Sequence, residues 1–409
     1  MNRILFRHAN VFDGENVPLL PDHDVLVEAG IIRAVAPHGL PADGADVVEC
    51  AGRALLPGLI DAHTHIYGAS VNIAAVATAP QTYIAHYSAQ FLRHSLDCGF
   101  TTIRDVGAGD IGAARALKEG LIAGPRLFYG GRALSQTAGH GDARNAELDP
   151  VTCCSCATLH TDFFAVVADG VDAVRAATRE QLRRGASHIK IMASGGVLSP
   201  RDPIDRCQFS DAEIRTVVEE TERWGAYVAA HCHPTAAVRR CVELGVRSIE
   251  HGSLIDAETA DFCAARGAFV VPTLAGAFAF HADPLLTKPS QDKLSFVVDR
   301  MLSGLSLMER AGVRMGFGTD LLGPHYLKEC TEFTLRSQVQ RPLEILRSAC
   351  SVNAELLQQS GRLGCIRPGA YADLLVVDGN PLENIALLAQ DGARLSVILA
   401  QGRFHKRTI

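Results

Sequence analysis

From residue 55 onward, short apolar runs alternate with longer amphipathic segments such as residues 211–225 and 234–245. This alternation predicts repeated β/α units. The runs expected to form strands are residues 55–66, 100–107, 125–131, 187–194, 226–233, 247–252, 269–274 and 313–320. Eight strands, each followed by a helical segment, predict an α/β fold of the (β/α)8 type, a TIM barrel of about 300 residues.

The two ends of the chain carry a different pattern. Residues 1–57 and 364–409 consist of short predicted strands separated by turns, and neither segment is large enough to fold alone. Pairing the two segments gives one small β-domain, a β-sandwich, beside a barrel of residues 58–363. We therefore expect both termini to lie in the same domain.

The composition and charge are those of an ordinary globular protein. Of the 409 residues, 47% are hydrophobic and 21% are charged, and the formal net charge is −6. A mildly acidic chain with scattered charges carries no signature of nucleic-acid binding. The first apolar run is interrupted by Arg7 and His8, and no apolar stretch is long enough to cross a membrane. A cytoplasmic protein is therefore predicted.

The twelve cysteines, without a secretory leader, predict reduced thiols. Three of them, Cys153, Cys154 and Cys156, lie together in "TCCSC". Their spacing is tighter than that of a usual zinc site, and no second cysteine pair lies at zinc-ribbon distance. Metal binding by these three cysteines is therefore less favoured than ordinary reduced thiols.

Side chains that commonly bind metals stand at the ends of several predicted strands. His63 and His65 occupy alternating positions, so both project to the same face of one strand. Such a pair forms either core histidines bonded to backbone carbonyls or part of a metal site. Later strands also end in such residues, namely His231 and His233, His251, and Asp320. Because barrel active sites lie at the carboxyl ends of the strands, this recurrence favours the metal site.

Lys190 lies in the middle of the apolar run 187–194. One interpretation is a lysine whose ammonium group reaches the end of the strand. The other is chemical, because burial near positive charge lowers a lysine pKa from about 10.4, and the neutral amine can react with carbon dioxide. The resulting carbamate has two oxygens that can bridge two metals. Spacing alone leaves both interpretations open.

The motifs "PGLIDAHTH", "AAHCH", "IEHG" and "GTD", together with the strand lysine, resemble the amidohydrolase superfamily in its binuclear form with a carboxylated lysine. The chain is most similar to the imidazolonepropionase-like branch, which contains prolidase-like Xaa-Pro dipeptidases and N-acyl-amino-acid carboxypeptidases. Residues 131–142, 189–203 and 315–323 have close counterparts there, and both chain ends resemble the superfamily's β-domain. The resemblance covers essentially the whole chain.

This resemblance implies two divalent metal ions. One would be held by His63, His65 and Asp320, the other by His231 and His251, with a carbamate on Lys190 bridging them. Zinc is the expected metal, because it suits imidazole and carboxylate donors.

The implied reaction is hydrolysis of the amide bond of a dipeptide or an N-acyl-L-amino acid by a hydroxide that bridges the metals. His140 would help at the carbonyl under attack, and Asp320 would take the proton of the hydroxide and pass it to the leaving nitrogen. The expected substrate contacts are His140, His233 and Arg201. Relatives often have tyrosine at the position of His233, so the substrate group bound there is open.

Two alternatives are a hydrolase of cyclic amides such as imidazolones and a non-catalytic assembly protein that has lost a metal ligand. His325 is a less favoured substrate contact, and His86 and His94 are expected to be solvent-exposed or packing residues. The expected partners are a small amide or dipeptide substrate and further copies of the chain in a homo-oligomer, with neither nucleic acid nor membrane.

Overall fold

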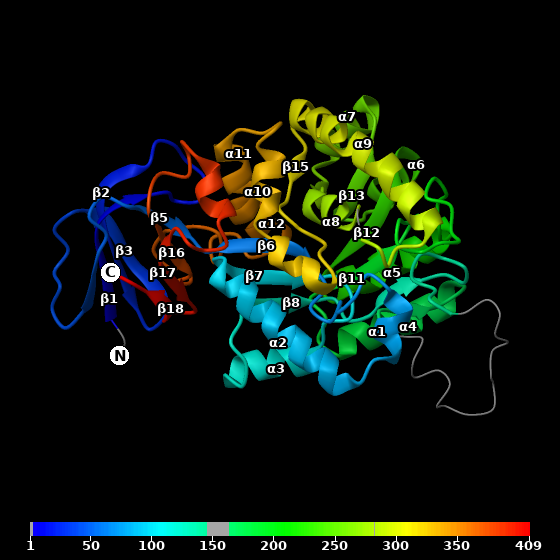
Figure 1. Ribbon diagram of the computed structural model, residues 1–409, viewed down its shortest axis with the longest axis horizontal. Helices are drawn as coiled ribbons and strands as arrows, with labels where there is room; N and C mark the ends of the chain where they lie inside the picture. Colours follow the sequence, from blue (N-terminus) through cyan, green and yellow to red (C-terminus); the bar gives the residue numbers. More distant parts are fainter. Residues whose placement is uncertain (1–2, 145–162, 282) are drawn as a thin grey trace.

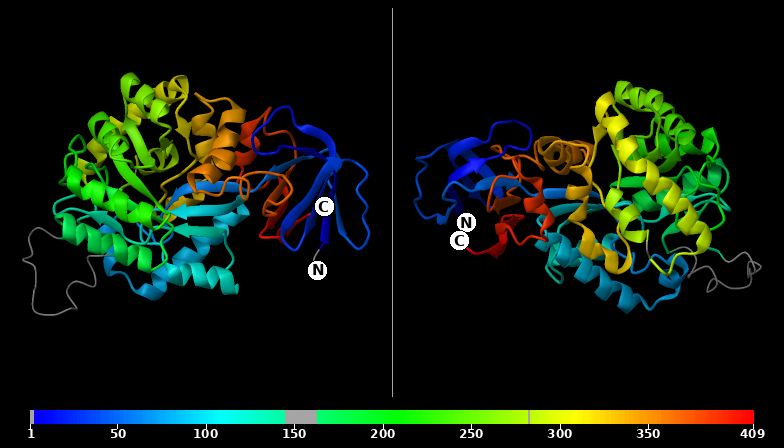
Figure 2. Two further views of the ribbon diagram at one scale, coloured as in Figure 1. Left: turned by 180° about the vertical axis from the view of Figure 1, so that it is seen from behind. Right: turned by 45° about the horizontal axis from the view of Figure 1, so that its top comes forward.

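The computed structural model describes residues 3–144, 163–281 and 283–409, so Cys153, Cys154 and Cys156 lie outside the described residues. A barrel surrounded by helices lies beside a small β-domain that contains both ends of the chain (Figure 1). The same two units are separate in both views of Figure 2. The predicted fold, a TIM barrel with a β-domain built from the chain ends, is confirmed.

The two chain ends form one hydrogen-bonded sheet in the order β18-β17-β16-β5-β1-β2-β3, with β4 paired to β1. Its strands are β1 (Arg3–Val11), β2 (Leu20–Glu28), β3 (Ile31–Pro37), β4 (Asp46–Glu49), β5 (Ala54–Pro57), β16 (Leu374–Val377), β17 (Leu395–Ala400) and β18 (Arg403–Arg407). The N-terminal and C-terminal strands join where β5 pairs antiparallel with β16. Phe6, Val25 and Val397 belong to one apolar core, so strands from both ends of the chain pack around the same core.

The barrel strands run in chain order around the second unit. They are β6 (Leu59–Thr64), β7 (Phe100–Asp105), β8 (Arg126–Tyr129), β11 (His188–Met192), β12 (Tyr227–Pro234), β13 (Ser248–Leu254), β14 (Phe269–Val271) and β15 (Arg314–Met315). Each coincides with one of the predicted apolar runs, and β12 and β13 extend one and two residues beyond theirs. Short strands β9 (Ala133–Ser135) and β10 (Ala165–Val167) extend the ladder beside β11. Hydrogen bonds from Ser187 N to Tyr129 O, 2.9 Å, and from Ala62 N to Phe317 O, 2.8 Å, connect the two ladders into a ring.

The first predicted strand, residues 55–66, is two strands in the structure. β5 belongs to the sheet of the β-domain, and β6 belongs to the barrel. The chain passes between them at Gly58, where an added Cβ would lie 2.0 Å from Thr101 Oγ1. Both halves are apolar because each is buried in a different sheet, and periodicity alone does not mark the division.

Helices cover the outside of the barrel. They are α1 (Ile73–Thr78), α2 (Gln81–Asp97), α3 (Ile111–Glu119), α4 (Val171–Arg183), α5 (Asp211–Arg223), α6 (Thr235–Glu243), α7 (Ala257–Arg266), α8 (Leu274–Phe280), α9 (Lys288–Ala311), α10 (Thr331–Arg336), α11 (Pro342–Arg347) and α12 (Asn353–Leu356). Two short 3-10 helices, η1 (Gly323–Lys328) and η3 (Ile385–Ala389), and one short π-helix, η2 (Ser348–Val352), connect later elements. Ile214 and Val217 of α5 belong to the same apolar core as Val228 of β12. The strands are therefore buried beneath the helices, and the barrel opens only at its ends.

Two expectations about the whole chain concern membranes and thiols. Within the described ranges, no helix combines the length and apolar character needed to span a bilayer. The cysteines in those ranges are free thiols, as expected for a chain with reduced cysteines.

Candidate active site

The strand-end side chains singled out from the sequence meet at the carboxyl end of the barrel. His63 Nε2 and His65 Nε2 lie 3.4 and 3.2 Å from Asp320 Oδ1. The His251 ring lies 5.0 Å from the His63 ring and 4.7 Å from the His231 ring, measured between centroids. Four strands therefore contribute to one continuous cluster, in which Asp320 stands opposite the histidines.

The backbone at two of these positions is left-handed. His251 has φ of 74° and Asp320 has φ of 56°, a region that residues other than glycine rarely adopt. The Asp320 amide donates to the backbone carbonyl of His63 at 2.8 Å. Such conformations persist where the surroundings hold them and gather at functional sites. Here they bring an imidazole from within β13 and a carboxylate from the loop after β15 into the cluster.

The donor set fits a divalent metal ion. Ligand atoms of His63, His251 and Asp320 all lie within 4.8 Å of one another. His63 Nε2 is buried and makes no hydrogen bond within the described part of the chain. A buried ring nitrogen without a partner is costly, and a metal ion would satisfy it. Imidazole nitrogens with carboxylate oxygens are common zinc ligands. The structure thus contains a His/Asp cluster that could hold a divalent metal ion.

A buried ion pair behind the cluster sets the orientation of His63. His63 Nδ1 donates to Glu250 Oε2 at 2.6 Å, which leaves Nε2 directed at the cluster. Arg104 Nη2 donates to both oxygens of Glu250, at 2.8 and 2.9 Å, and Ser248 Oγ donates to one of them at 2.6 Å. Burial alone would raise the pKa of Glu250, but Arg104 and His63 hold it well below its usual range. A carboxylate behind a metal-binding histidine fixes its tautomer and strengthens it as a ligand.

Lys190 is buried inside the barrel, with 2% of its surface exposed. Burial lowers its pKa, while Glu250 and Asp320 oppose the shift. Its ammonium has no hydrogen bond or ion pair within the residues that the structure describes. An unpaired buried ammonium is an unfavourable state, and loss of its proton relieves it. Lys190 is therefore not a lysine whose side chain extends to the solvent.

His140 covers the cluster on the side of β12. Its ring stacks on that of His231, with centroids 4.3 Å apart, and its Nδ1 is hydrogen-bonded to Ser199 Oγ at 2.6 Å. The stack requires a glycine at position 196, because a Cβ there would lie 2.2 Å from His140 Cε1. His231 Nε2 donates to the Gly195 carbonyl at 3.2 Å, so its Nδ1 keeps a free lone pair.

The loop after β11 carries the candidate Arg201, which is exposed, and its role as a substrate contact stays a prediction. The buried charge of that loop is Asp202, whose Oδ2 accepts from the Gly196 amide at 2.9 Å and lies 3.6 Å from His140 Nδ1. Lys293 of α9 donates to the Gly196 carbonyl at 3.0 Å and to the Ser199 carbonyl at 2.7 Å. Asp202 and Lys293 therefore shape the loop beside His140, and the sequence interpretation missed both.

His233 is buried two residues after His231 on the same strand face. Its Nδ1 is 3.2 Å from Ser253 Oγ, and its amide donates to Ser194 Oγ at 3.1 Å. Burial, reinforced by His140, lowers its pKa to about 3. His233 is therefore neutral at physiological pH, and its ring can offer one donor and one acceptor.

The remaining histidines considered from the sequence lie outside this cluster. His325 Nε2 is hydrogen-bonded to Asp283 at 2.6 Å, and His86 is exposed. His94 is half-buried and lies at 3.5 Å from the thiol of Cys98. The structure therefore gives His94 a polar partner that the sequence pattern did not indicate.

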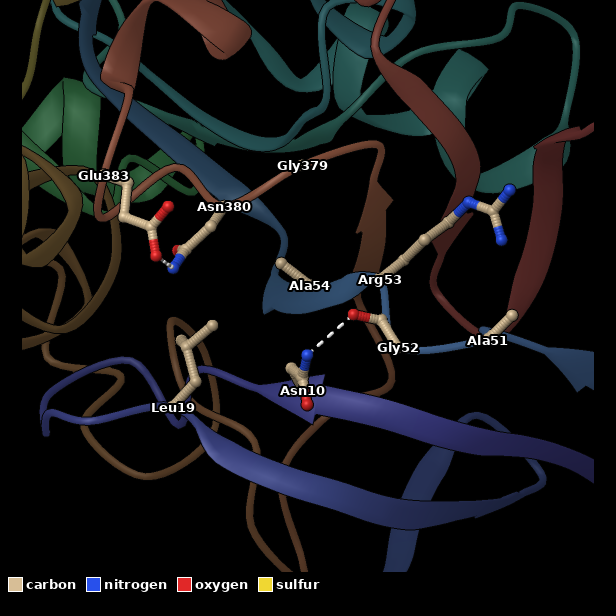
Figure 3. A pocket seen from close by; sticks show the side chains of 9 residues that line it. All are labelled: Asn10, Leu19, Ala51, Gly52, Arg53, Ala54, Gly379, Asn380 and Glu383. Atoms are coloured by element: carbon tan, nitrogen blue, oxygen red, sulfur yellow. Dashed lines mark hydrogen bonds between the residues drawn. The ribbon is translucent and has the colours of Figure 1, made fainter.

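A pocket of about 360 Å³ lies away from the barrel opening, in the β-domain (Figure 3). Asn10 donates to the Gly52 carbonyl at 2.6 Å, and Asn380 donates to Glu383 at 2.8 Å. Its charged lining groups are Arg53 and Glu383, and it contains no histidine or cysteine. The strand ends of the barrel are therefore the better candidate for catalysis.

Comparison with known proteins agrees with this geometry. The sequence profile of the amidohydrolase family matches residues 54–403. The chain belongs to the amidohydrolase family. This amidohydrolase is 34% identical over 353 residues to ochratoxinase from Aspergillus niger, covering 83% of this chain and 73% of that protein. It is 25% identical over 391 residues to imidazolonepropionase from Deinococcus radiodurans, covering 93% and 92% of the two chains.

A solved structure of a prolidase in complex with N-methylphosphonate-L-proline is also similar. It is 42% identical, covers 99% of this amidohydrolase and 100% of its own chain, and superimposes with a TM-score of 0.94. The predicted resemblance to prolidase-like amidohydrolases is therefore confirmed, and the chain is a hydrolytic enzyme of C–N bonds that acts on small molecules.

The buried ion pair gives a first prediction. Arg104→Met removes the partner of a fully buried Glu250, so the free energy of unfolding should fall by about 3–5 kcal/mol. Adding Glu250→Gln should recover part of this loss, because the carboxylate is then no longer buried without its cation. Chemical denaturation measures both variants.

The matched control is Arg179→Met, which removes an exposed arginine from Glu220 but leaves Arg175 and Arg223 as its partners, so the free energy of unfolding should fall far less. Equal losses in Arg104→Met and Arg179→Met would contradict the importance assigned to the buried pair.

Proposed function

We propose that this amidohydrolase cleaves the amide bond of dipeptides or N-acyl-L-amino acids, in the manner of Xaa-Pro dipeptidases and carboxypeptidases. The observation that carries the proposal is the joining of His63, His251 and Asp320 in one cluster, with the neutral His233 beside it. The similarity to a prolidase bound to a phosphonate of proline supports this substrate class. The similarity to ochratoxinase is a second link to hydrolases.

The proposed metal content is two divalent ions, with zinc as the metal. His63, His65 and Asp320 would hold one ion, His231 and His251 the other, and a carbamate on Lys190 would bridge them. Two ring nitrogens support this assignment, the free Nδ1 of His231 and the Nε2 of His63, which makes no hydrogen bond in the described part of the chain. When bound, such ions polarise a carbonyl oxygen and lower the pKa of water toward about 7.

The residues of the chain would then position the substrate and move the proton. Burial opposes ionisation of Asp320, but His63, His65 and His251 hold its pKa well below its usual range. An ionised carboxylate at this point can accept a proton from the attacking water and release it to the leaving nitrogen. His140, supported by Ser199, would assist at the carbonyl from the opposite wall. Glu250 would keep His63 in one tautomer throughout.

Recognition of the substrate is assigned to His233, His140 and Arg201. His233 can donate a hydrogen bond to a terminal carboxylate or to the scissile carbonyl without carrying charge. Arg201 would supply positive charge from the exposed loop for a free carboxylate. The homo-oligomer and the absence of nucleic-acid binding stay predictions.

The principal alternative is hydrolysis of a cyclic amide, which the similarity to imidazolonepropionase supports. Such a substrate would not need a group that binds a free carboxylate. A non-catalytic assembly protein is disfavoured, because every proposed ligand position carries a residue that can bind a metal.

Screening zinc-loaded enzyme against dipeptides, N-acyl-L-amino acids and imidazolones tests the function directly. We expect hydrolysis of Xaa-Pro dipeptides or N-acyl-L-amino acids, with much slower turnover of their C-terminal amides. Activity confined to cyclic amides would overturn the proposed substrate class.

A second variant tests the bridging role of Lys190. Lys190→Ala should lose metal and activity together, because the carbamate would supply a ligand to both ions. Short carboxylic acids added to this variant should restore part of both, since a carboxylate can occupy the vacated position. Elemental analysis and kinetics measure the outcome. Normal metal content in Lys190→Ala would show that the lysine is not a ligand.

A third prediction concerns His233. His233→Ala should lower kcat/KM by the equivalent of about 1–3 kcal/mol, the penalty for leaving a buried polar group unpaired. His233→Tyr should keep much of the activity, because the phenol can also donate one hydrogen bond.

The control for His233 is the same substrate with its terminal carboxylate converted to an amide. If His233→Ala impairs both substrates equally, the residue does not recognise the carboxylate. No loss with either substrate would remove it from the binding site altogether.

A further inference from the structure

A second group of metal-binding side chains lies outside the barrel opening, at the C-terminal end of α2. His94 Nε2 is 3.5 Å from the thiol of Cys98, one helical turn further along. Asp391 reaches the same point from the loop before β17, and one ligand atom of each residue lies within 4.8 Å of the other two. An imidazole, a thiol and a carboxylate therefore converge from two domains.

The backbone holds Asp391 near α2. Gly392 has φ of 75°, and a Cβ at this position would lie 2.0 Å from the carbonyl oxygen of Asp97. The Lys406 ammonium donates to the Gly392 carbonyl at 2.9 Å, and His405 Nε2 is 2.5 Å from Asp97 Oδ1. The approach of the loop to the helix is therefore built into the fold and does not depend on the exposed Asp391 side chain.

Two buried polar side chains, Glu329 and Cys330, lie near Cys98. Glu329 is 1% exposed, and neither of its carboxylate oxygens has a hydrogen-bond partner in the described part of the chain. Burial and the neighbouring Cys98 raise the pKa of Glu329 well above its usual range. Cys330 is equally buried, and together with burial it raises the pKa of the Cys98 thiol. Unsatisfied buried carboxyl groups are rare and often accompany an ion.

The spacing of His94 and Cys98 matches that of two ligands of one zinc ion. Zinc–sulfur and zinc–nitrogen bonds of about 2.3 and 2.0 Å at a tetrahedral angle place the two donor atoms about 3.5 Å apart. The donor types also suit zinc better than magnesium or calcium, which prefer oxygen.

We propose that His94, Cys98 and Asp391 bind a zinc-type divalent cation. The ion would fasten α2 of the barrel to the loop of residues 390–394 in the β-domain. Binding releases the proton of the Cys98 thiol to solvent and leaves one thiolate on the metal, with no change of oxidation state. This structural site is independent of the proposed hydrolysis and of the metals in the barrel.

Cobalt substitution of the full-length protein separates this site from the barrel. A thiolate bound to Co²⁺ gives an intense charge-transfer band in the near ultraviolet, whereas the barrel ligands are nitrogen and oxygen atoms only. We expect the band in the wild-type protein, its loss in Cys98→Ser, and its retention in the control Cys263→Ser, which alters another buried thiol. Elemental analysis should show that Cys98→Ser loses about one ion per chain relative to Cys263→Ser.

Asp391→Asn provides a test that does not disturb the core, since Asp391 is exposed. It should weaken Co²⁺ binding at this site at least tenfold, while Asp205→Asn, at another exposed aspartate, should not. A full charge-transfer band and unchanged metal content in Cys98→Ser would overturn the proposal. So would a disulfide between Cys98 and Cys330 in protein purified with a reductant, or an Asp391→Asn variant with unchanged Co²⁺ affinity.

Discussion

The buried pair between Arg104 and Glu250 is the interaction on which the barrel opening depends. Two opposite charges with no exposed surface are tolerated only when each is fully paired. Glu250 also accepts a hydrogen bond from His63, and Arg104 also donates to the backbone carbonyl of Ala62. One ion pair therefore joins three strands, and it aims the first candidate ligand at the centre of the cluster.

Around this pair, the barrel controls charge through burial. Lys190 and His233 have lowered pKa values because they are removed from water, while Asp320 stays ionised because histidines surround it. The result is a small region in which the ionised Asp320 carboxylate faces several imidazole groups. Such a region attracts divalent cations, and the same metals would make it useful for amide hydrolysis.

Much of this arrangement could be predicted from the sequence. Parallel strands all present their carboxyl ends on one side, so histidines at those ends had to meet, and the alternation of β6 placed His63 and His65 on one face. The partnership of Arg104 with Glu250 could not be predicted in this way. Each is one charge in an apolar strand, and their contact depends on the position of two strands that are not neighbours. In "SPRDP", likewise, the pattern could not decide that Asp202 is buried and Arg201 exposed.

The pairing of β5 with β16 also affects how the chain folds as it is synthesised. The N-terminal strands leave the ribosome first, yet the partner of Leu55 is Val376, close to the other end of the sequence. The β-domain can complete its sheet only after almost the whole barrel has been translated. Until then the edge of β5 has no partner on that side, and an unpaired strand edge is prone to non-native association. Early folding of the barrel, which follows directly after β5, would shorten the time for which this edge remains exposed.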